Sequence, residues 1–208
     1  NEVFSRLILS IKQLHNFYDL KRFLICLVFY QAGIQTVVVI TAIYAQQVMS
    51  FNYNDTILLV VLVNITAALG AFIFGAIQDR IGHTQTIAIA LIGWIIMILL
   101  AWGSQDRTTF WVATNIAGVS LGASQSAGRA LIGYLSPALR HAEFFGLWGL
   151  AVKLSSIIGP ITYGLVSWIS QGDHRLAMLI TSSYFIVGLL ILIGVNVQRG
   201  RETALNNN

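Results

Sequence analysis

Two basic side chains lie inside apolar runs, where charge is costly, and they are the first candidates for chemistry. Lys153 follows Glu143 by ten residues, about 15 Å along a helix, which places it near the middle of a membrane. Arg129 precedes Pro137 by eight residues, about 12 Å, so its long side chain reaches either a cavity or the membrane surface. Because an unpaired charge in lipid needs a counter-charge, these cations predict an anionic solute group or an acid on a partner domain.

Acids and histidines are not expected beside these cations. Every carboxylate and all four histidines fall in terminal segments or in connections between the apolar runs. A membrane hydrolase would need such ligands at membrane depth, so the sequence predicts neither an enzyme, nor a metal site, nor a cofactor. The single cysteine, Cys26, has no partner for a disulfide and no companions for a cysteine metal cluster.

Uncharged polar residues and glycines continue this pattern along the run that holds Arg129. They recur at three- and four-residue steps and therefore share one helical stripe, which we expect to face protein or water. The stripe comprises Asn115, Gly118, Gly122, Gln125 and Arg129. For the glycines, close helix packing is the preferred interpretation.

Other runs supply further candidates. Gln31 and Gln35 lie one turn apart and suit hydrogen bonds to a polar solute, although bonding between helices is an equal alternative; Asn64 is a weaker candidate. Gly159 and Pro160 interrupt the backbone ladder near Lys153 and predict a kink. Small and polar residues share the face of Lys153, namely Gly146, Gly149, Ser156 and Pro160.

Long apolar helices must position these residues. Of the 208 residues, 56% are hydrophobic and 10% are charged, against about 25% charged in soluble domains. Short connections separate runs of a length that crosses a hydrocarbon core of about 30 Å, and the runs are too long and continuous for barrel strands. The sequence predicts an all-α membrane protein, a six-transmembrane-helix bundle with spans at 23–47, 56–78, 86–103, 109–135, 144–169 and 175–198. The third and sixth runs carry few polar groups and are assigned to the lipid-facing periphery.

The distribution of basic residues predicts the orientation of this bundle. One side collects eight of the basic residues in the end segments and connections, whereas the other has only Arg107 and Arg175, so both ends of the chain should be cytoplasmic. Residues 1–22 are expected to form a cytoplasmic amphipathic helix or a linker helix without a cleaved leader, residues 23–198 the bundle, and residues 199–208 a cytoplasmic tail. The net charge of +4 follows from this topology, so nucleic-acid binding is not predicted.

One connection carries a motif. Between the second and third runs the chain reads Gly75-Ala-Ile-Gln-Asp79-Arg80-Ile-Gly82, which resembles the Gly-x-x-x-Asp-Arg-x-Gly signature of the major facilitator superfamily. In this position each charge meets a helix dipole, and the glycines allow close packing and a sharp turn.

Further stretches are similar to one branch of that superfamily, which includes the fungal vacuolar amino-acid effluxer linked to autophagy and many bacterial transporters. They are the segments 30–36, 122–129 and 137–146. What they match is the carboxy-terminal half, spans seven to twelve of twelve, although Ala32 stands where the branch often has an acid.

The resemblance implies a secondary active transporter that works by alternating access, with a missing amino-terminal six-helix half as partner and spans one, two, four and five lining the path. It implies a small anionic or zwitterionic solute such as an amino acid, and a location in the bacterial inner membrane or the fungal vacuolar membrane. The expected solute contacts are Arg129, Lys153, Gln31, Gln35, Asn64, Asn115 and Gln125. A non-transporting membrane scaffold or receptor bundle remains the alternative.

Overall fold

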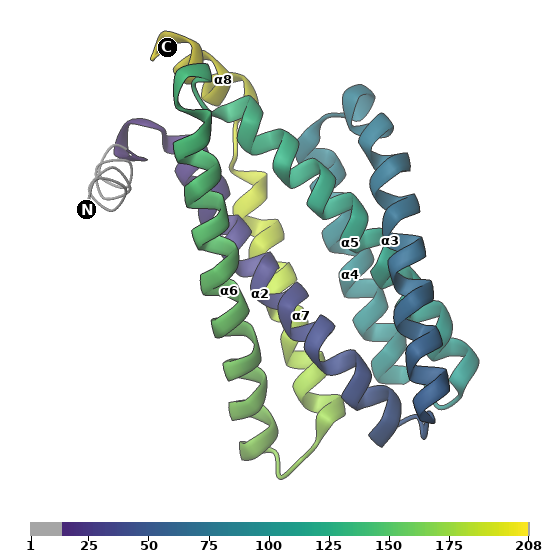
Figure 1. Ribbon diagram of the computed structural model, residues 1–208. Helices are drawn as coiled ribbons and strands as arrows, with labels where there is room; N and C mark the ends of the chain where they lie inside the picture. The colour runs from purple at the N-terminus through teal and green to yellow at the C-terminus, as the bar shows by residue number, and fades with distance from the viewer. Residues whose placement is uncertain (1–13, 208) are drawn as a thin grey trace.

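The computed structural model describes residues 14–207, and within them every regular element is a helix (Figure 1). The long helices are α2 (Tyr18–Gln47), α3 (Tyr53–Ile81), α4 (His83–Gly103), α5 (Arg107–Leu135), α6 (His141–Ile169) and α7 (His174–Ile193). Two short 3-10 turns, Leu14–Asn16 and Ala138–Arg140, precede α2 and α6, and a short helix α8 (Val197–Asn206) follows α7.

Polar residues define where several helices begin. Asn52 and Asp55 form a capping box at the start of α3, and the Asp106 carboxylate accepts a hydrogen bond of 2.8 Å from the Thr109 N–H at the start of α5. The bonds from Thr109 hold the pKa of the Asp106 carboxyl below its usual value. Asp173 caps α7 in the same way. These caps stand between apolar runs, so each connection can stay short.

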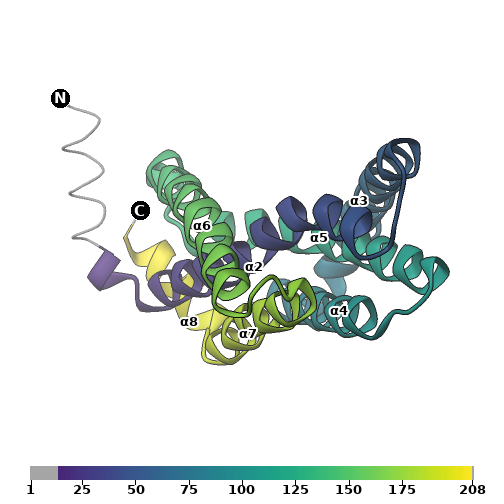
Figure 2. The same ribbon diagram turned by 90° about the horizontal axis from the view of Figure 1, so that it is seen from below.

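The helices form two groups of three. α3 and α4 each pack along α5, whereas α6 and α7 each pack along α2. Figure 2 shows α3 and α6 projecting to one side of the bundle and α4 and α7 lying on the other, with α2 and α5 between them. The prediction of a six-helix all-α bundle is confirmed.

Five of the helices within residues 14–207 are long and apolar enough to cross a membrane, namely α2, α3, α4, α6 and α7. α5 has 29 residues but carries the polar stripe, which lowers its hydropathy. Its position between α3 and α4 explains how a less apolar helix fits the bundle, because the flanking helices cover much of its surface.

The exposed surfaces of the outer helices are apolar. Phe72 of α3 is 81% exposed, Leu190 of α7 is 62% exposed and Ile157 of α6 is 57% exposed. Such surfaces are costly in water and neutral against lipid tails. They agree with the multi-pass membrane protein that the sequence predicts.

The described part of the chain departs from the predicted boundaries at both ends. α2 begins at Tyr18, five residues before the expected span, and the expected helix over 1–22 lies mostly outside the described residues. The sixth span ends at Ile193, because Asn196 caps a separate helix α8. The predicted tail is therefore largely helical.

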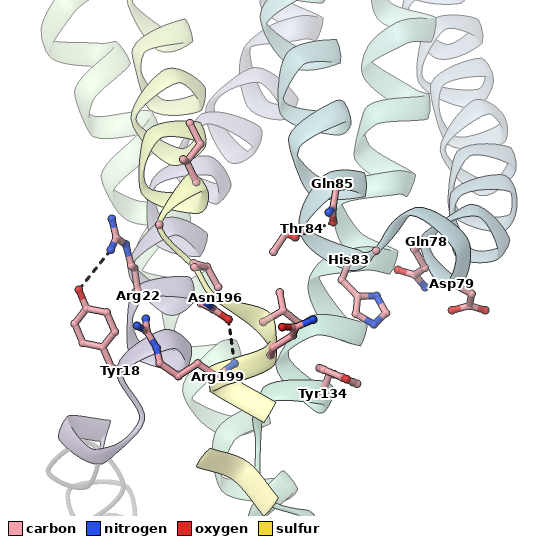
Figure 3. Close-up of a pocket in the computed structure, with 16 residues that line it drawn as sticks. Tyr18, Arg22, Gln78, Asp79, His83, Thr84, Gln85, Tyr134, Asn196 and Arg199 are labelled. Atoms are coloured by element: carbon pink, nitrogen blue, oxygen red, sulfur yellow. Dashed lines mark hydrogen bonds between the residues drawn. The ribbon is translucent and has the colours of Figure 1, made fainter. Parts of the chain in front are cut away.

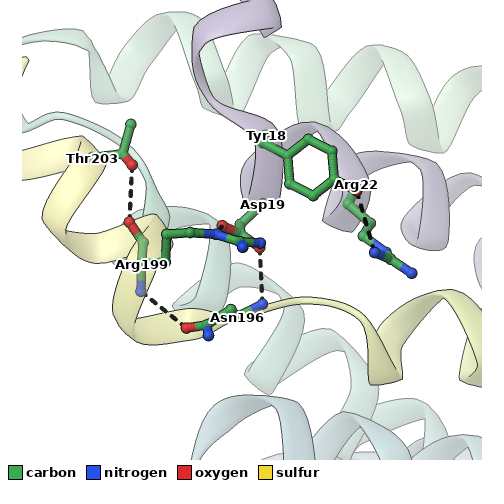
Figure 4. A network of polar contacts seen from close by, with 6 residues as sticks. All are labelled: Tyr18, Asp19, Arg22, Asn196, Arg199 and Thr203. Atoms are coloured by element: carbon green, nitrogen blue, oxygen red, sulfur yellow. Dashed lines mark hydrogen bonds and ion pairs between the residues drawn. The ribbon is translucent and has the colours of Figure 1, made fainter.

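Asp19, which the sequence places in the segment before the first span, is a buried carboxylate at one end of the bundle. It stands in the first turn of α2 and is only 2% exposed, and its two oxygens accept hydrogen bonds of 2.7 and 2.8 Å from the Arg199 guanidinium of α8 (Figure 4). The Asn196 backbone N–H also donates to Asp19, at 2.9 Å. These bonds and the charge of Asp19 raise the pKa of Arg199. α2 and α8 are thus joined at one end of the bundle.

Candidate solute site on the central face

The two predicted glutamines of α2 and α5 meet at the centre of the bundle. Gln125 Nε2 of α5 donates to Gln31 Oε1 of α2 at 3.3 Å, and Gln31 is 1% exposed. Beside this pair a Cβ on Gly128 would lie 2.8 Å from the Tyr30 hydroxyl, so the glycine permits the close approach of α2 and α5. We use the name central face for the predicted solute contacts Gln31, Gln125, Arg129 and Lys153, of which the Gln31–Gln125 bond joins two.

Arg129 lies one turn beyond Gln125 on α5 and is exposed. Its guanidinium carbon stands 5.4 Å from the ring centroid of Trp148 on α6, a cation–π contact. Stacking uses the flat face of the guanidinium and leaves its N–H edge available for a carboxylate or phosphate. Within residues 14–207 no acid forms an ion pair with Arg129.

Lys153 is the second cation of the central face. It is exposed, and no acid of the described chain forms an ion pair with it. Thr162, nine residues further along α6, bonds to the Tyr184 hydroxyl of α7 at 2.6 Å. Nine residues are two and a half helical turns, so Lys153 points away from α7. Ser155, two residues after Lys153, donates to Val28 O of α2, so Lys153 points away from α2 as well, and its place beside Arg129 stays a prediction.

The remaining predicted contacts lie apart from this group. Gln35 lies one turn from Gln31 but does not join the Gln31–Gln125 bond; it is half-buried, and its side chain has no hydrogen bond within the described residues. Asn64 donates to Val60 O at 2.8 Å and lines a cavity of about 150 Å³ between α2, α3 and α5. Asn115 lines a different surface, a groove between α3, α4 and α5. The sequence grouped Asn115 with Gln125, but the stripe of α5 is broad enough to reach two surfaces.

The glycines of the stripe pack helices. A Cβ on Gly118 would lie 2.6 Å from Val63 O of α3, and a Cβ on Gly122 would overlap Ala67 O of the same helix. The packing interpretation is confirmed for both.

Gly159 has the same role between α6 and α2. A Cβ there would overlap Ala32 O and the Thr36 hydroxyl, so Gly159 lets the two backbones approach. α6 continues through Pro160 without a break in its helical assignment. The kink assigned to Gly159 and Pro160 stays a prediction, and the close α2–α6 contact is what the structure adds.

A single residue, Gly82, connects the two helices at the signature motif. Asp79 and Arg80 belong to the last turn of α3, and Gly82, at φ +98°, ends α3 and begins α4. This φ favours glycine, and a Cβ would also overlap the Gln85 side chain. Gly75 is less constrained, because a Cβ there would lie at an ordinary distance of 3.4 Å from the Ser126 hydroxyl.

The loop borders a cavity of about 1010 Å³ at the α8 end of the bundle (Figure 3). Asp79 and His83 line it from one side, and Tyr18, Arg22 and Arg199 from the other. The two sides of the cavity belong to different groups of helices, so the signature loop lies where the two groups meet.

Sequence reasoning missed two features of this region. Trp148, which stacks under Arg129, lies on α6, and an isolated tryptophan in an apolar run gives no signal of such a contact. The Asp19–Arg199 pair joins residues 180 positions apart. The only local hint was the spacing of Asn196 and Arg199, which suits a helix cap.

Comparison with known proteins gives one family. The family profile described as "Vacuole effluxer Atg22 like" matches residues 2–205. The chain is 22% identical over 205 residues to the uncharacterised MFS-type transporter YxiO of Bacillus subtilis, covering 99% of this chain and 47% of that protein.

Fungal proteins are similar over comparable lengths. Autophagy-related protein 22 of Cryptococcus neoformans is 26% identical over 210 residues, covering 93% of this chain and 37% of its own length. Autophagy-related protein 22 of Saccharomyces cerevisiae is 24% identical over 212 residues, covering 94% and 39%. The chain thus spans less than half the length of these relatives.

Proposed function

The chain belongs to the Atg22-like vacuole effluxer family of major facilitator transporters, and from that membership we propose that it is the carboxy-terminal six-helix half of a secondary active transporter. It works with an amino-terminal six-helix half by alternating access. Its described ends lie together at one end of the bundle, which we assign to the cytoplasm, in a bacterial inner membrane or a fungal vacuolar membrane.

The proposed solute is small and carries a carboxylate or another anionic group, and an amino acid fits this chemistry. The observation that carries the proposal is the pair of exposed cations, Arg129 and Lys153, without an acid partner among residues 14–207. In a closed transporter both would be desolvated, and an anionic solute would supply the missing charge. The Gln31–Gln125 pair, one helical turn from Arg129, offers amide groups for a further polar contact.

Counterflow of labelled amino acids in proteoliposomes that contain the full-length protein tests this proposal. We expect Arg129→Ala and Lys153→Ala each to lower counterflow strongly while the thermal unfolding temperature stays close to that of the parent. Lys21→Ala is the matched control, because Lys21 is an exposed cation of α2 outside the central face. Counterflow that survives both substitutions would refute the anion site, and an absence of movement for every solute would favour the scaffold alternative.

A further inference from the structure

A groove of about 560 Å³ runs along α5 between α3 and α4, on a surface that the transport proposal does not use. α5 forms its floor from Thr108 to Ala123, and Phe74 of α3 and Ile89 of α4 lie on its flanks. No residue of α2, α6 or α7 lines it. Figure 2 shows α3 and α4 on the side of the molecule away from α6 and α8, and the groove that they line with α5 lies on that side.

The lining of the groove suits an apolar ligand. No charged side chain contributes, and two of the polar donors that line it are turned back to their own helices. Asn115 Nδ2 donates to Trp111 O at 2.8 Å, and the Thr66 hydroxyl donates to Val63 O at 3.0 Å. A polar solute would therefore find few free donors here, whereas a hydrocarbon chain needs none.

The length and the position of the groove fit one lipid chain. Thr108 and Ala123 are fifteen residues apart, about 22 Å along the helix, which is more than half of a hydrocarbon core of about 30 Å. The groove begins one residue after Arg107, which forms an ion pair of 3.5 Å with Asp55 and has a side chain that is 55% exposed. Because charges are costly in lipid, this pair marks the membrane surface, with the groove descending from it.

We propose that this groove binds one acyl chain of a phospholipid, with the chain along α5 and the lipid headgroup beside the Arg107–Asp55 pair. α3 and α4 pack on α5 more than on each other, so the chain fills space that neither helix occupies. Asn115 is then part of a lipid site and not a solute contact. The proposal depends on the membrane location of the bundle and is independent of whether the protein transports an amino acid.

The test uses a phosphatidylcholine with a photoactivatable diazirine in its acyl chain, reconstituted with the full-length protein. After detergent washing and illumination, labelled peptides are mapped by mass spectrometry. We expect lipid in the groove to survive the washing and to label residues 108–123. Lipid on the exposed face of α4 around Ile92 and Ile96 should be washed away and leave that face unlabelled. These two residues are 46% and 45% exposed and do not line the groove.

Two variants make the test specific. Val112→Phe with Ile116→Phe fills the groove and should lower the retained label several-fold, because Val112 is 52% exposed and both residues line the groove. Ile92→Phe with Ile96→Phe places two phenylalanines at the same spacing outside the groove and should leave the label unchanged. Arg107→Gln should lower lipid retention without moving the label along α5.

Three outcomes would overturn the proposal. If washing removes lipid equally from the groove and from the α4 face, the groove contacts only ordinary surrounding lipid. The absence of label from residues 108–123 would mean that protein covers the groove. Retention of glycerol phosphate, which has no acyl chain, to the same degree as the phospholipid would mean that Arg107 binds a phosphate and the groove binds nothing.

Discussion

At the scale of single residues, the function of the central face depends on which groups its amide and cationic side chains contact. Gln31 is buried and its oxygen accepts the Gln125 amide, so its role is either solute binding or helix contact. The two roles differ in what a substitution changes, because a solute contact affects apparent affinity and a helix contact affects folding.

Gln31→Leu tests which role holds. We expect the half-saturating solute concentration to rise roughly tenfold, the equivalent of about 1.4 kcal/mol, because one hydrogen-bonding group is lost. Kinetics of counterflow measure this change. Gln47→Leu, at the exposed end of α2, should leave the kinetics unchanged. A lower unfolding temperature with unaltered kinetics would instead make Gln31 a helix contact.

The Asp19–Arg199 pair gives a second prediction at this scale. We expect Asp19→Asn to lower the unfolding temperature, because the buried acceptor of two guanidinium bonds loses its charge. The double variant with Arg199→Gln should lose less than the sum of the two single changes, since both remove the same interaction. Thermal unfolding in detergent measures all three.

Arg140→Gln serves as the control for this pair. Arg140 pairs with Glu143 at 2.7 Å, and the Glu143 side chain is 36% exposed against 2% for Asp19, so water screens its charge more. A drop for Arg140→Gln as large as that for Asp19→Asn would show that burial does not set the strength of the α2–α8 contact.

At the scale of the elements, glycines decide which helices touch. Gly122 of α5 meets the α3 backbone, whereas Gly149 of α6 has open space where a side chain would begin. Both lie in runs of small and polar residues, and their sequence surroundings do not distinguish them.

We therefore expect Gly122→Leu to destabilise the bundle by about 3 kcal/mol or more, because the added side chain forces α5 away from α3. Gly149→Leu should fold with almost parental stability. The yield of monodisperse protein and its unfolding temperature check both. Equal tolerance at the two positions would contradict the tight α3–α5 contact.

At the scale of the whole molecule, the positions of the chain ends leave one choice open, namely which end of the bundle faces the cytoplasm. α8 and the start of α2 are joined by Asp19 and Arg199, and the connection before α5 lies at the opposite end of the bundle. The excess of basic residues assigns the α8 end to the cytoplasm.

Cysteine labelling in intact cells or vacuoles checks that choice. A membrane-impermeant maleimide should label Gln105→Cys from the non-cytoplasmic side and Glu202→Cys only from the cytoplasmic side, since both positions are exposed. The native Cys26 is buried and should stay unlabelled, so it provides the background. The reverse pattern would invert the assignment of both ends.

The sequence by itself determined that the protein lies in a membrane, that it forms six long helices and to which family it belongs. Each of these depends on local composition, on the length of an apolar run or on a short motif. The signature loop and the packing glycines belong to the same class, as Gly82 and Gly122 show. Only the tertiary structure decided which polar residues share a surface. Gln31 and Gln125 meet across 94 positions, Asp19 and Arg199 across 180, and Asn115 turns to a lateral groove. Helical periodicity gives the direction of a side chain relative to its own helix, and the packing of α5 against its neighbours determines what stands in that direction.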